Sequence, residues 1–132
     1  MRNSILFTIL LFGWITSYSQ VDPADVTIVR DTFGVPHIYG ITDADAAYGL
    51  AWAHCEDDFD NVQRGALAGK GLLGSVEGKD GVLFDFGLQY LNIDSLVDAR
   101  YELDLSPEYQ SVVEAYAQSM NAFAETHPKE IL

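Results

Sequence analysis

The sequence VTIVRDTFGVPHIYG, residues 26–40, carries the clearest fold signal in the chain. Residues 26–31 alternate apolar and polar side chains, residues 32–34 are typical of a turn, and residues 35–39 resume an extended pattern. Pro36 has no backbone N–H to donate, so we expect it at the start or the edge of its strand. The stretch therefore predicts a β-hairpin.

A long helix is expected after this hairpin. Thr42 is suited to be its N-cap, and Asp45 is placed to reach back to the free backbone donors. Gly69 and Gly71 are expected to end it. Small and apolar side chains recur at three- and four-residue spacing along one stripe, made of Ala47, Leu50, Ala51, His54, Cys55, Phe59, Val62 and Ala66. Because most of them are small, we expect another helix or backbone segment to pack closely on this stripe.

The second half of the chain is less regular. Residues 72–92 contain four glycines and are expected to form an irregular connector. A short amphipathic helix is expected at residues 95–103. A stronger helix is predicted from Ser106, an N-cap followed by Pro107, and it should end before Pro128. Its predicted apolar face consists of Tyr109, Val112, Val113, Tyr116, Ala117, Met120 and Phe123 or Ala124.

The chain has the features of an exported protein. Residues 1–19 combine Arg2, an apolar segment and small residues before Gln20, which indicates a signal peptide rather than a membrane anchor, since a span needs about 20 apolar residues.

The rest of the chain is strongly acidic. Six Lys and Arg minus twenty Asp and Glu leave residues 20–132 with a formal charge of −14. This balance argues against nucleic acid as a partner. Cys55 is the single cysteine, so no internal disulfide is expected.

Three blocks resemble a known family in the order in which they occur. They are VRDTFGVPHIYG, AAYGLAWAHCEDDFDNVQRGALAGKGLLGSVEG and EAYAQSMNAFAETHP, and together they cover most of residues 28–128. Their order and sequence are similar to the N-terminal part of the α chain in the penicillin acylase family. That family includes cephalosporin acylases and acyl-homoserine-lactone acylases. The implied fold class is α+β, a mostly helical N-terminal fragment of an αββα sandwich with an early hairpin.

The resemblance also implies a chemistry. Members are N-terminal-nucleophile hydrolases, exported as one precursor that cuts itself into α and β chains. The N-terminal Ser of the β chain then attacks an amide bond with its own α-amino group as the base. The family's catalytic Ser follows the processing junction, so residues 20–132 are expected to be an incomplete domain without catalytic, cofactor-binding or metal-binding residues. Expected partners are its own β chain and a small N-acyl substrate in the periplasm or outside the cell, and a calcium ion is compatible with the complete protein.

Two features within the blocks invite a functional interpretation. His37 could be a base or a metal ligand, but no second ligand lies at metal spacing, and the resemblance makes it a structural histidine bonded to nearby backbone. The acidic run at residues 56–60 could bind calcium or hold a catalytic carboxylate pair. Its carboxylates should fan over different helix faces, however, so we expect Asp57 or Asp58 to be held structurally by Arg or backbone donors.

Serines offer no alternative nucleophile in the sequence. Ser75, Ser95, Ser106, Ser111 and Ser119 fall in expected turns, caps or helix surfaces, and none forms a nucleophile elbow.

The substrate remains open at this level. Penicillin-type members commonly carry Ala-Gln-Asp-Arg where residues 55–58 read Cys-Glu-Asp-Asp, and Gly where Ser119 stands, which leans toward the cephalosporin or homoserine-lactone branches. An acyl-homoserine-lactone acylase is thus one alternative. A small secreted acidic binding protein is the other, and it would need a self-sufficient core.

Overall fold

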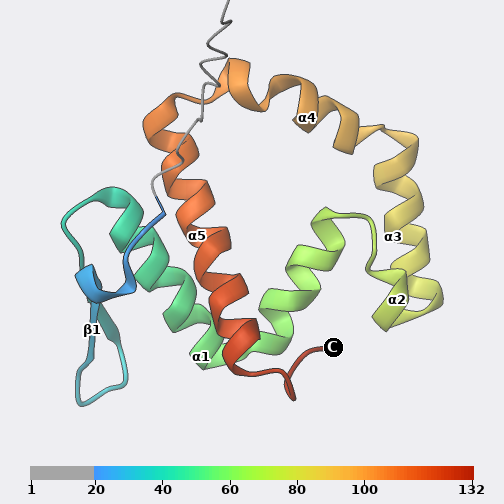
Figure 1. The fold of residues 1–132 in the computed structure, drawn as a ribbon. Coiled ribbons are helices and arrows are strands. Elements are labelled where there is room, and N and C mark those ends of the chain that lie inside the picture. Colours follow the sequence, from blue (N-terminus) through green and yellow to red (C-terminus); the bar gives the residue numbers. More distant parts are fainter. Residues whose placement is uncertain (1–19) are drawn as a thin grey trace, which may run out of the picture.

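The computed structural model describes residues 20–132 as one short hairpin followed by a series of helices (Figure 1). The elements are the 3-10 turn η1 (Pro23–Asp25), the strands β1 (Thr27–Arg30) and β2 (Pro36–Tyr39), and the helices α1 (Asp43–Gly69), α2 (Gly74–Glu77), α3 (Lys79–Tyr90), α4 (Ile93–Asp104) and α5 (Pro107–Thr126). The signal-peptide prediction falls on residues 1–19, outside the described part, so the proposed division at residue 20 stays a prediction.

The hairpin forms where the sequence predicts it. The strands β1 and β2 are antiparallel, with Thr27 opposite Tyr39 and Arg30 opposite Pro36. Pro36 is the first residue of β2, as its missing N–H requires. Gly34 lies in the turn at φ 84°, a conformation that side chains with a Cβ rarely adopt.

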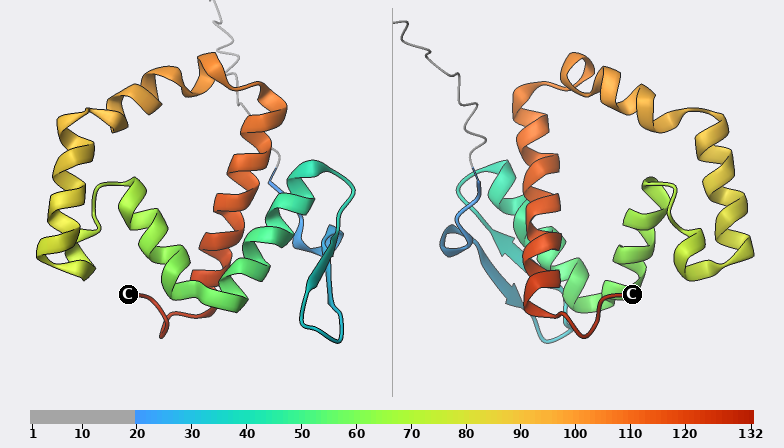
Figure 2. Two further views of the ribbon diagram at one scale, coloured as in Figure 1. Left: turned by 180° about the vertical axis from the view of Figure 1, so that it is seen from behind. Right: turned by 45° about the vertical axis from the view of Figure 1, so that its right-hand side comes forward.

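Helix α1 begins with the expected capping box. Thr42 accepts a hydrogen bond from the Asp45 N–H, and Asp45 accepts one in return from the Thr42 N–H. The helix is interrupted at Asp58, whose backbone is extended at φ −161° and ψ 70°. This break, which the sequence did not predict, bends α1 into the two arms visible in Figures 1 and 2.

The core lies between α1 and α5, which pack against each other (Figure 2). One buried cluster consists of Val21, Ala47, Tyr48 and Ala115. The second consists of Cys55, Phe59 and Phe123, with Trp52 packed against it. The close helix packing expected from the small side chains of α1 is confirmed.

Part of the predicted helix faces is wrong. Leu50, His54 and Ala66 are exposed on α1, whereas Tyr48 and Ala53 are buried. On α5, Tyr109, Val113 and Ala117 are exposed, whereas Ala115 and Ser119 are buried. The physical reason is that α1 is covered on two sides. Gly49 meets the hairpin, where a Cβ would approach Ile38 Cγ2 to 2.5 Å, and α5 covers a different face.

The expected irregular connector at residues 72–92 is also wrong, because α2 and α3 occupy most of it. Two of its glycines, Gly74 and Gly81, allow backbone segments to approach closely rather than forming loops. A Cβ on Gly81 would come within 2.6 Å of the Leu73 carbonyl oxygen. The buried Asp85 carboxylate accepts hydrogen bonds from the N–H groups of Leu73 and Gly74, at 2.9 and 2.8 Å, and so caps the start of α2.

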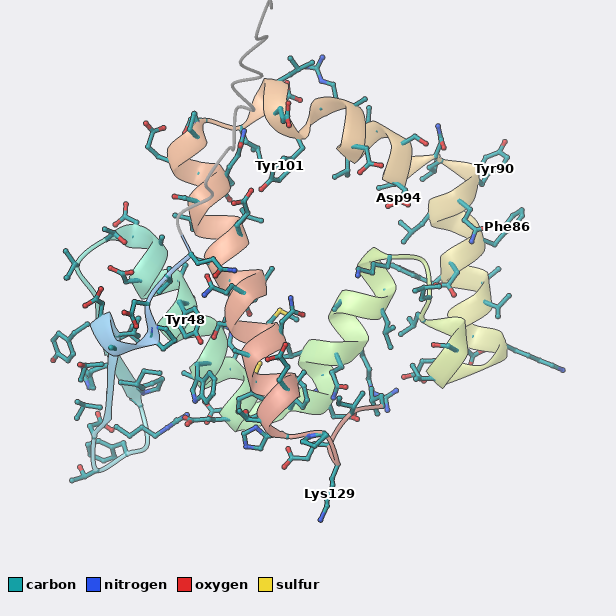
Figure 3. All side chains as sticks on the ribbon, viewed as in Figure 1. Tyr48, Phe86, Tyr90, Asp94, Tyr101 and Lys129 are labelled. Atoms are coloured by element: carbon teal, nitrogen blue, oxygen red, sulfur yellow. The ribbon has the colours of Figure 1, made fainter. Side chains whose placement is uncertain are left out.

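Helices α3 and α4 form an arm that leaves much apolar surface uncovered. Phe86 and Tyr90 stack with ring centroids 6.2 Å apart, and Figure 3 shows both side chains pointing outward from α3. Leu83 and Leu103 are each 75% exposed, and no residue of α4 is buried. Among residues 20–132, none of the helices combines the length and apolar character needed to cross a bilayer.

Candidate functional site

The most connected polar group of the described chain is the Arg30 guanidinium, at the end of β1. It lies 3.0 Å from Glu56 Oε2 and 2.8 Å from Asp57 Oδ1 on α1. It also donates to the backbone carbonyls of Gly34, at 2.9 Å, and Ala53, at 3.4 Å. Glu56 and Asp57 raise the pKa of Arg30, so the guanidinium stays charged. Arg30 thereby joins the hairpin turn to α1 just before the break in that helix.

Asp31, the next residue, organises the turn of the hairpin. Its Oδ1 accepts hydrogen bonds from the N–H groups of Phe33 and Val35, at 2.8 and 3.0 Å. The Val35 and Phe33 donors lower the pKa of Asp31. His37 Nε2 lies 3.5 Å from Asp31 Oδ2 on the neighbouring strand. The histidine thus contacts a carboxylate, rather than the backbone partner that we expected.

The acidic run is held by several separate partners. Asp58 caps the second half of α1, because its carboxylate accepts from the Asn61 N–H at 3.3 Å and from Asn61 Nδ2 at 2.6 Å. Asp60 pairs with Arg64 Nε at 2.7 Å, and Arg64 also reaches Glu77 near the start of the arm. The expectation that Asp57 or Asp58 is held by Arg or backbone donors is confirmed for both, Asp57 by Arg30 and Asp58 by Asn61.

The carboxylates of the acidic run are not gathered around one point that could hold a metal ion. In the part of the chain that the structure describes, no group of three His, Cys, Asp or Glu side chains is placed to hold a metal ion. The carboxylates of the run instead contact arginine side chains, the Trp52 indole N–H and Asn61. Arg30, with Glu56 and Asp57, fixes the hairpin on α1, whereas Asp58 and Asp60 make contacts within α1.

The hydroxyl groups serve local structure. Ser75 and Ser111 donate to backbone carbonyls three residues earlier, at 2.7 and 2.6 Å. Ser106 caps α5 by accepting from the Tyr109 N–H. Ser119 is completely buried, and its Oγ has no hydrogen-bond partner. The absence of catalytic residues from residues 20–132 stays a prediction.

Histidines and the cysteine also contact neighbouring helices. His54 Nδ1 lies 2.9 Å from the Tyr116 hydroxyl and links α1 to α5. His127 stacks on Phe123 with ring centroids 3.9 Å apart. Burial raises the pKa of the Cys55 thiol and of Tyr116, which disfavours a reactive thiolate at this position.

Comparison with known proteins decides the family. The family model described as penicillin amidase matches residues 25–131, which include the hairpin, the Arg30 contacts and all five helices. The chain belongs to the penicillin acylase family. Its resemblance to that family, carried by the three sequence blocks, is therefore confirmed.

The relatives share this ancestry at moderate identity. The chain is 26% identical over 133 residues to penicillin G acylase of Escherichia coli, a match that covers 98% of this chain and 16% of that protein. It is 27% identical over 99 residues to the acyl-homoserine lactone acylase QuiP of Pseudomonas fluorescens, with 75% of this chain and 12% of that protein covered. The chain thus spans less than a fifth of the length of these relatives.

A solved structure shows the same fold. The thermostable penicillin G acylase of Alcaligenes faecalis superposes with a TM-score of 0.62 over 80% of this chain and 55% of that chain, at 21% sequence identity. This supports the α+β assignment as part of a penicillin acylase fold, mostly helical with an early antiparallel hairpin. The sequence did not identify Arg30 as the partner of Glu56 and Asp57. The signal that could have indicated it is a basic residue at the end of a strand together with two acidic residues on the following helix.

Proposed function

We propose that this chain is the N-terminal part of the α chain of an exported amidohydrolase, which cleaves the amide bond of an N-acyl compound. The observation that carries the proposal is the family match over residues 25–131. Two acylases among the relatives support hydrolysis of such an amide. The signal-like pattern of residues 1–19 supports export to the periplasm or the medium.

The proposed reaction uses a serine at the N-terminus of a β chain released from the same precursor. Its α-amino group takes the hydroxyl proton as the hydroxyl attacks the amide carbonyl, and backbone or side-chain donors stabilise the resulting oxyanion. The protonated α-amino group gives this proton to the nitrogen of the leaving amine as the C–N bond breaks. Water then attacks the acyl-enzyme with the α-amino group again as base, and the proton returns to the serine oxygen as the acid is released. Ser75, Ser106 and Ser111 make hydrogen bonds to backbone groups three residues away, which is consistent with structural roles for these serines.

The part assigned to the described residues is structural. Arg30 fixes the hairpin to α1 through Glu56 and Asp57, while Phe123 fixes α5 to the same helix through Trp52 and Phe59. The exposed apolar side chains of α3 and the hairpin, such as Phe86 at 62% and Phe33 at 91%, would be covered by the β chain. A monomeric acidic binding protein would have little reason to expose such residues.

Two substrate classes are candidates, penicillin-type amides, as the name penicillin G acylase indicates, and N-acyl-homoserine lactones, as the name of the QuiP relative indicates. The identities of 26% and 27% favour neither. Calcium in the complete protein is likewise a proposal, and its ligands would have to come largely from outside residues 20–132.

The coding DNA beyond Leu132 tests the proposal first. The frame should continue to a small residue followed by Ser, the start of the β chain. A stop codon directly after Leu132 would refute it and favour the binding protein.

The purified complete enzyme tests the reaction. It should release acid from a phenylacetylated amide, from a long-chain acyl-homoserine lactone, or from both, and the ratio of the two kcat/KM values assigns the specificity. Replacing the β-chain N-terminal Ser with Ala should abolish hydrolysis of either substrate. Activity that survives this substitution would exclude the proposed nucleophile.

A further inference from the structure

The first residues of the described chain are fastened to the last helix. On α5, Gln118 Oε1 accepts a hydrogen bond from the Val21 N–H at 3.0 Å, and Gln118 Nε2 donates to the Val21 carbonyl at 2.9 Å. One carboxamide thus satisfies both backbone groups of a residue 97 positions away, as a neighbouring strand would. Such a two-point contact fixes the position and the direction of the backbone at Val21.

The Val21 side chain adds an apolar anchor to this contact. It is 7% exposed and packs with Ala47, Tyr48 and Ala115 in the first core cluster. Gln20, the preceding residue, is exposed. Val21 is therefore held on α5 by its backbone and in the core by its side chain, whereas Gln20, one residue earlier, lies at the surface.

We propose that Gln118 is the docking site for the mature N-terminus of this chain, which it holds at the second residue after the export signal has been removed before Gln20. This rests on the proposed function, because it takes export and signal removal as given. The occupant is the segment Gln20–Val21 of the chain itself. Cleavage before Gln20 leaves every contact of Val21 in place, whereas cleavage one residue later would place the new charged terminus directly on Gln118.

Docking should protect the mature terminus from exopeptidases. An aminopeptidase needs a free, extended terminus, so it can remove Val21 only when the contact with Gln118 opens. When opening and closing are fast, the trimming rate follows the population of the open form. Two hydrogen bonds of ordinary strength correspond to a change of roughly ten- to a hundredfold in that population.

The test uses the complete exported protein and its Gln118→Leu variant. The N-terminal peptide is first identified by mass, either with Gln20 intact or with Gln20 cyclised after loss of ammonia, and a pyroglutamate-removing enzyme is added in the second case. An aminopeptidase is then added, and loss of Val21 is followed by mass spectrometry. We expect Gln118→Leu to lose Val21 about ten- to a hundredfold faster than the unmodified protein.

Two further variants make the result specific. Gln110→Leu removes a glutamine of the same helix that donates to the Leu105 carbonyl and not to Val21. This variant should lose Val21 at the same rate as the unmodified protein. Gln118→Glu keeps the acceptor for the Val21 N–H and loses the donor, so an intermediate rate is expected.

Equal trimming of Val21 in all variants, from a protein that begins at Gln20, would overturn the docking and leave export standing. A purified protein that still carries residues before Gln20, or that begins after Val21, would overturn the assignment of the mature terminus. The proposed amide hydrolysis would be unaffected in both cases, because it is measured separately.

Discussion

Phe123 holds the two helices of the core together, and its replacement by Ala should loosen them measurably. The side chain is 4% exposed. Its ring meets Trp52 edge-on at a centroid distance of 5.2 Å and Phe59 at 4.9 Å, and His127 stacks on it. Truncating a buried Phe to Ala costs about 3–5 kcal/mol, which includes the cavity left behind.

Hydrogen exchange of α5 amides in the complete enzyme is the appropriate assay, because it reports local opening free energies inside a large protein. A cost of 3–5 kcal/mol raises the population of the open form by about two to four orders of magnitude, since about 1.4 kcal/mol is tenfold. Exchange of amides in the middle of α5 should accelerate by that factor in Phe123→Ala.

Phe123→Leu is the matched control. It keeps most of the apolar volume and loses the ring–ring contacts, which contribute about 0.5–1.5 kcal/mol per pair. The expected acceleration is about tenfold to a hundredfold, clearly less than for Ala. If Ala accelerates exchange by less than tenfold, or if Leu and Ala are indistinguishable, Phe123 does not join α5 to α1 as described.

Three further predictions concern the Ser119 hydroxyl, the Asp45 carboxylate and residues 20–132 expressed alone. Ser119→Ala should raise the thermal unfolding midpoint of the complete enzyme, because it removes a buried hydroxyl without a partner, whose burial costs about 1–3 kcal/mol; a lower midpoint would mean that Ser119 makes a contact in the enzyme. The Thr42 N–H, with the Thr42 hydroxyl and the Ile41 N–H, lowers the pKa of Asp45. Its carboxylate therefore stabilises the fold above the ordinary carboxyl pKa of about 4, and this contribution is lost as the pH falls through the lowered value. The midpoints of the enzyme and of Asp45→Asn should converge at acid pH, and a constant difference would contradict this. Residues 20–132 expressed alone should bind a hydrophobic dye and unfold without a sharp calorimetric transition, and cooperative unfolding of a monomer would contradict this.

The local signals of the sequence predicted most of the elements. Pro36 and the turn at Gly34 defined the hairpin, the Thr42 and Asp45 pair defined the start of α1, and Ser106 with Pro107 defined the start of α5. Each of these signals is local. A proline without an N–H, a glycine that accepts a positive φ, or a side chain that caps a free backbone donor acts within four residues along the chain. Such signals hold whatever the rest of the chain does.

Contacts that a helical periodicity does not encode explain what the sequence could not predict. Glycines such as Gly74 and Gly81 are typical of a loop. The Asp85 carboxylate, however, accepts hydrogen bonds from the Leu73 and Gly74 N–H groups and so stabilises the start of α2. The break at Asp58 follows from a cap on Asn61 within a continuous helical pattern. Likewise, the two-sided burial of α1 around Gly49 depends on the hairpin, which a single helical periodicity does not encode.

The candidate site was predictable in part. The sequence indicated that Asp57 or Asp58 needed a basic or backbone partner, because a charged group beside an apolar face is costly unless paired. Arg30 as that partner is 27 residues earlier and on another element, so only the fold identifies it. Substrate specificity was not predictable, since the chain spans 16% of the length of penicillin G acylase and 12% of that of the lactone acylase.

In the proposed mechanism the reactive hydroxyl comes from polypeptide outside residues 20–132. Treating the complete, active enzyme with a serine-directed sulfonyl fluoride until hydrolysis stops, and then mapping the modified peptide by mass spectrometry, tests it most directly. We expect a single modification, on the N-terminal Ser of a second chain. A sulfonyl group on Ser75, Ser111 or any other serine of residues 20–132, in proportion to the lost activity, would contradict it.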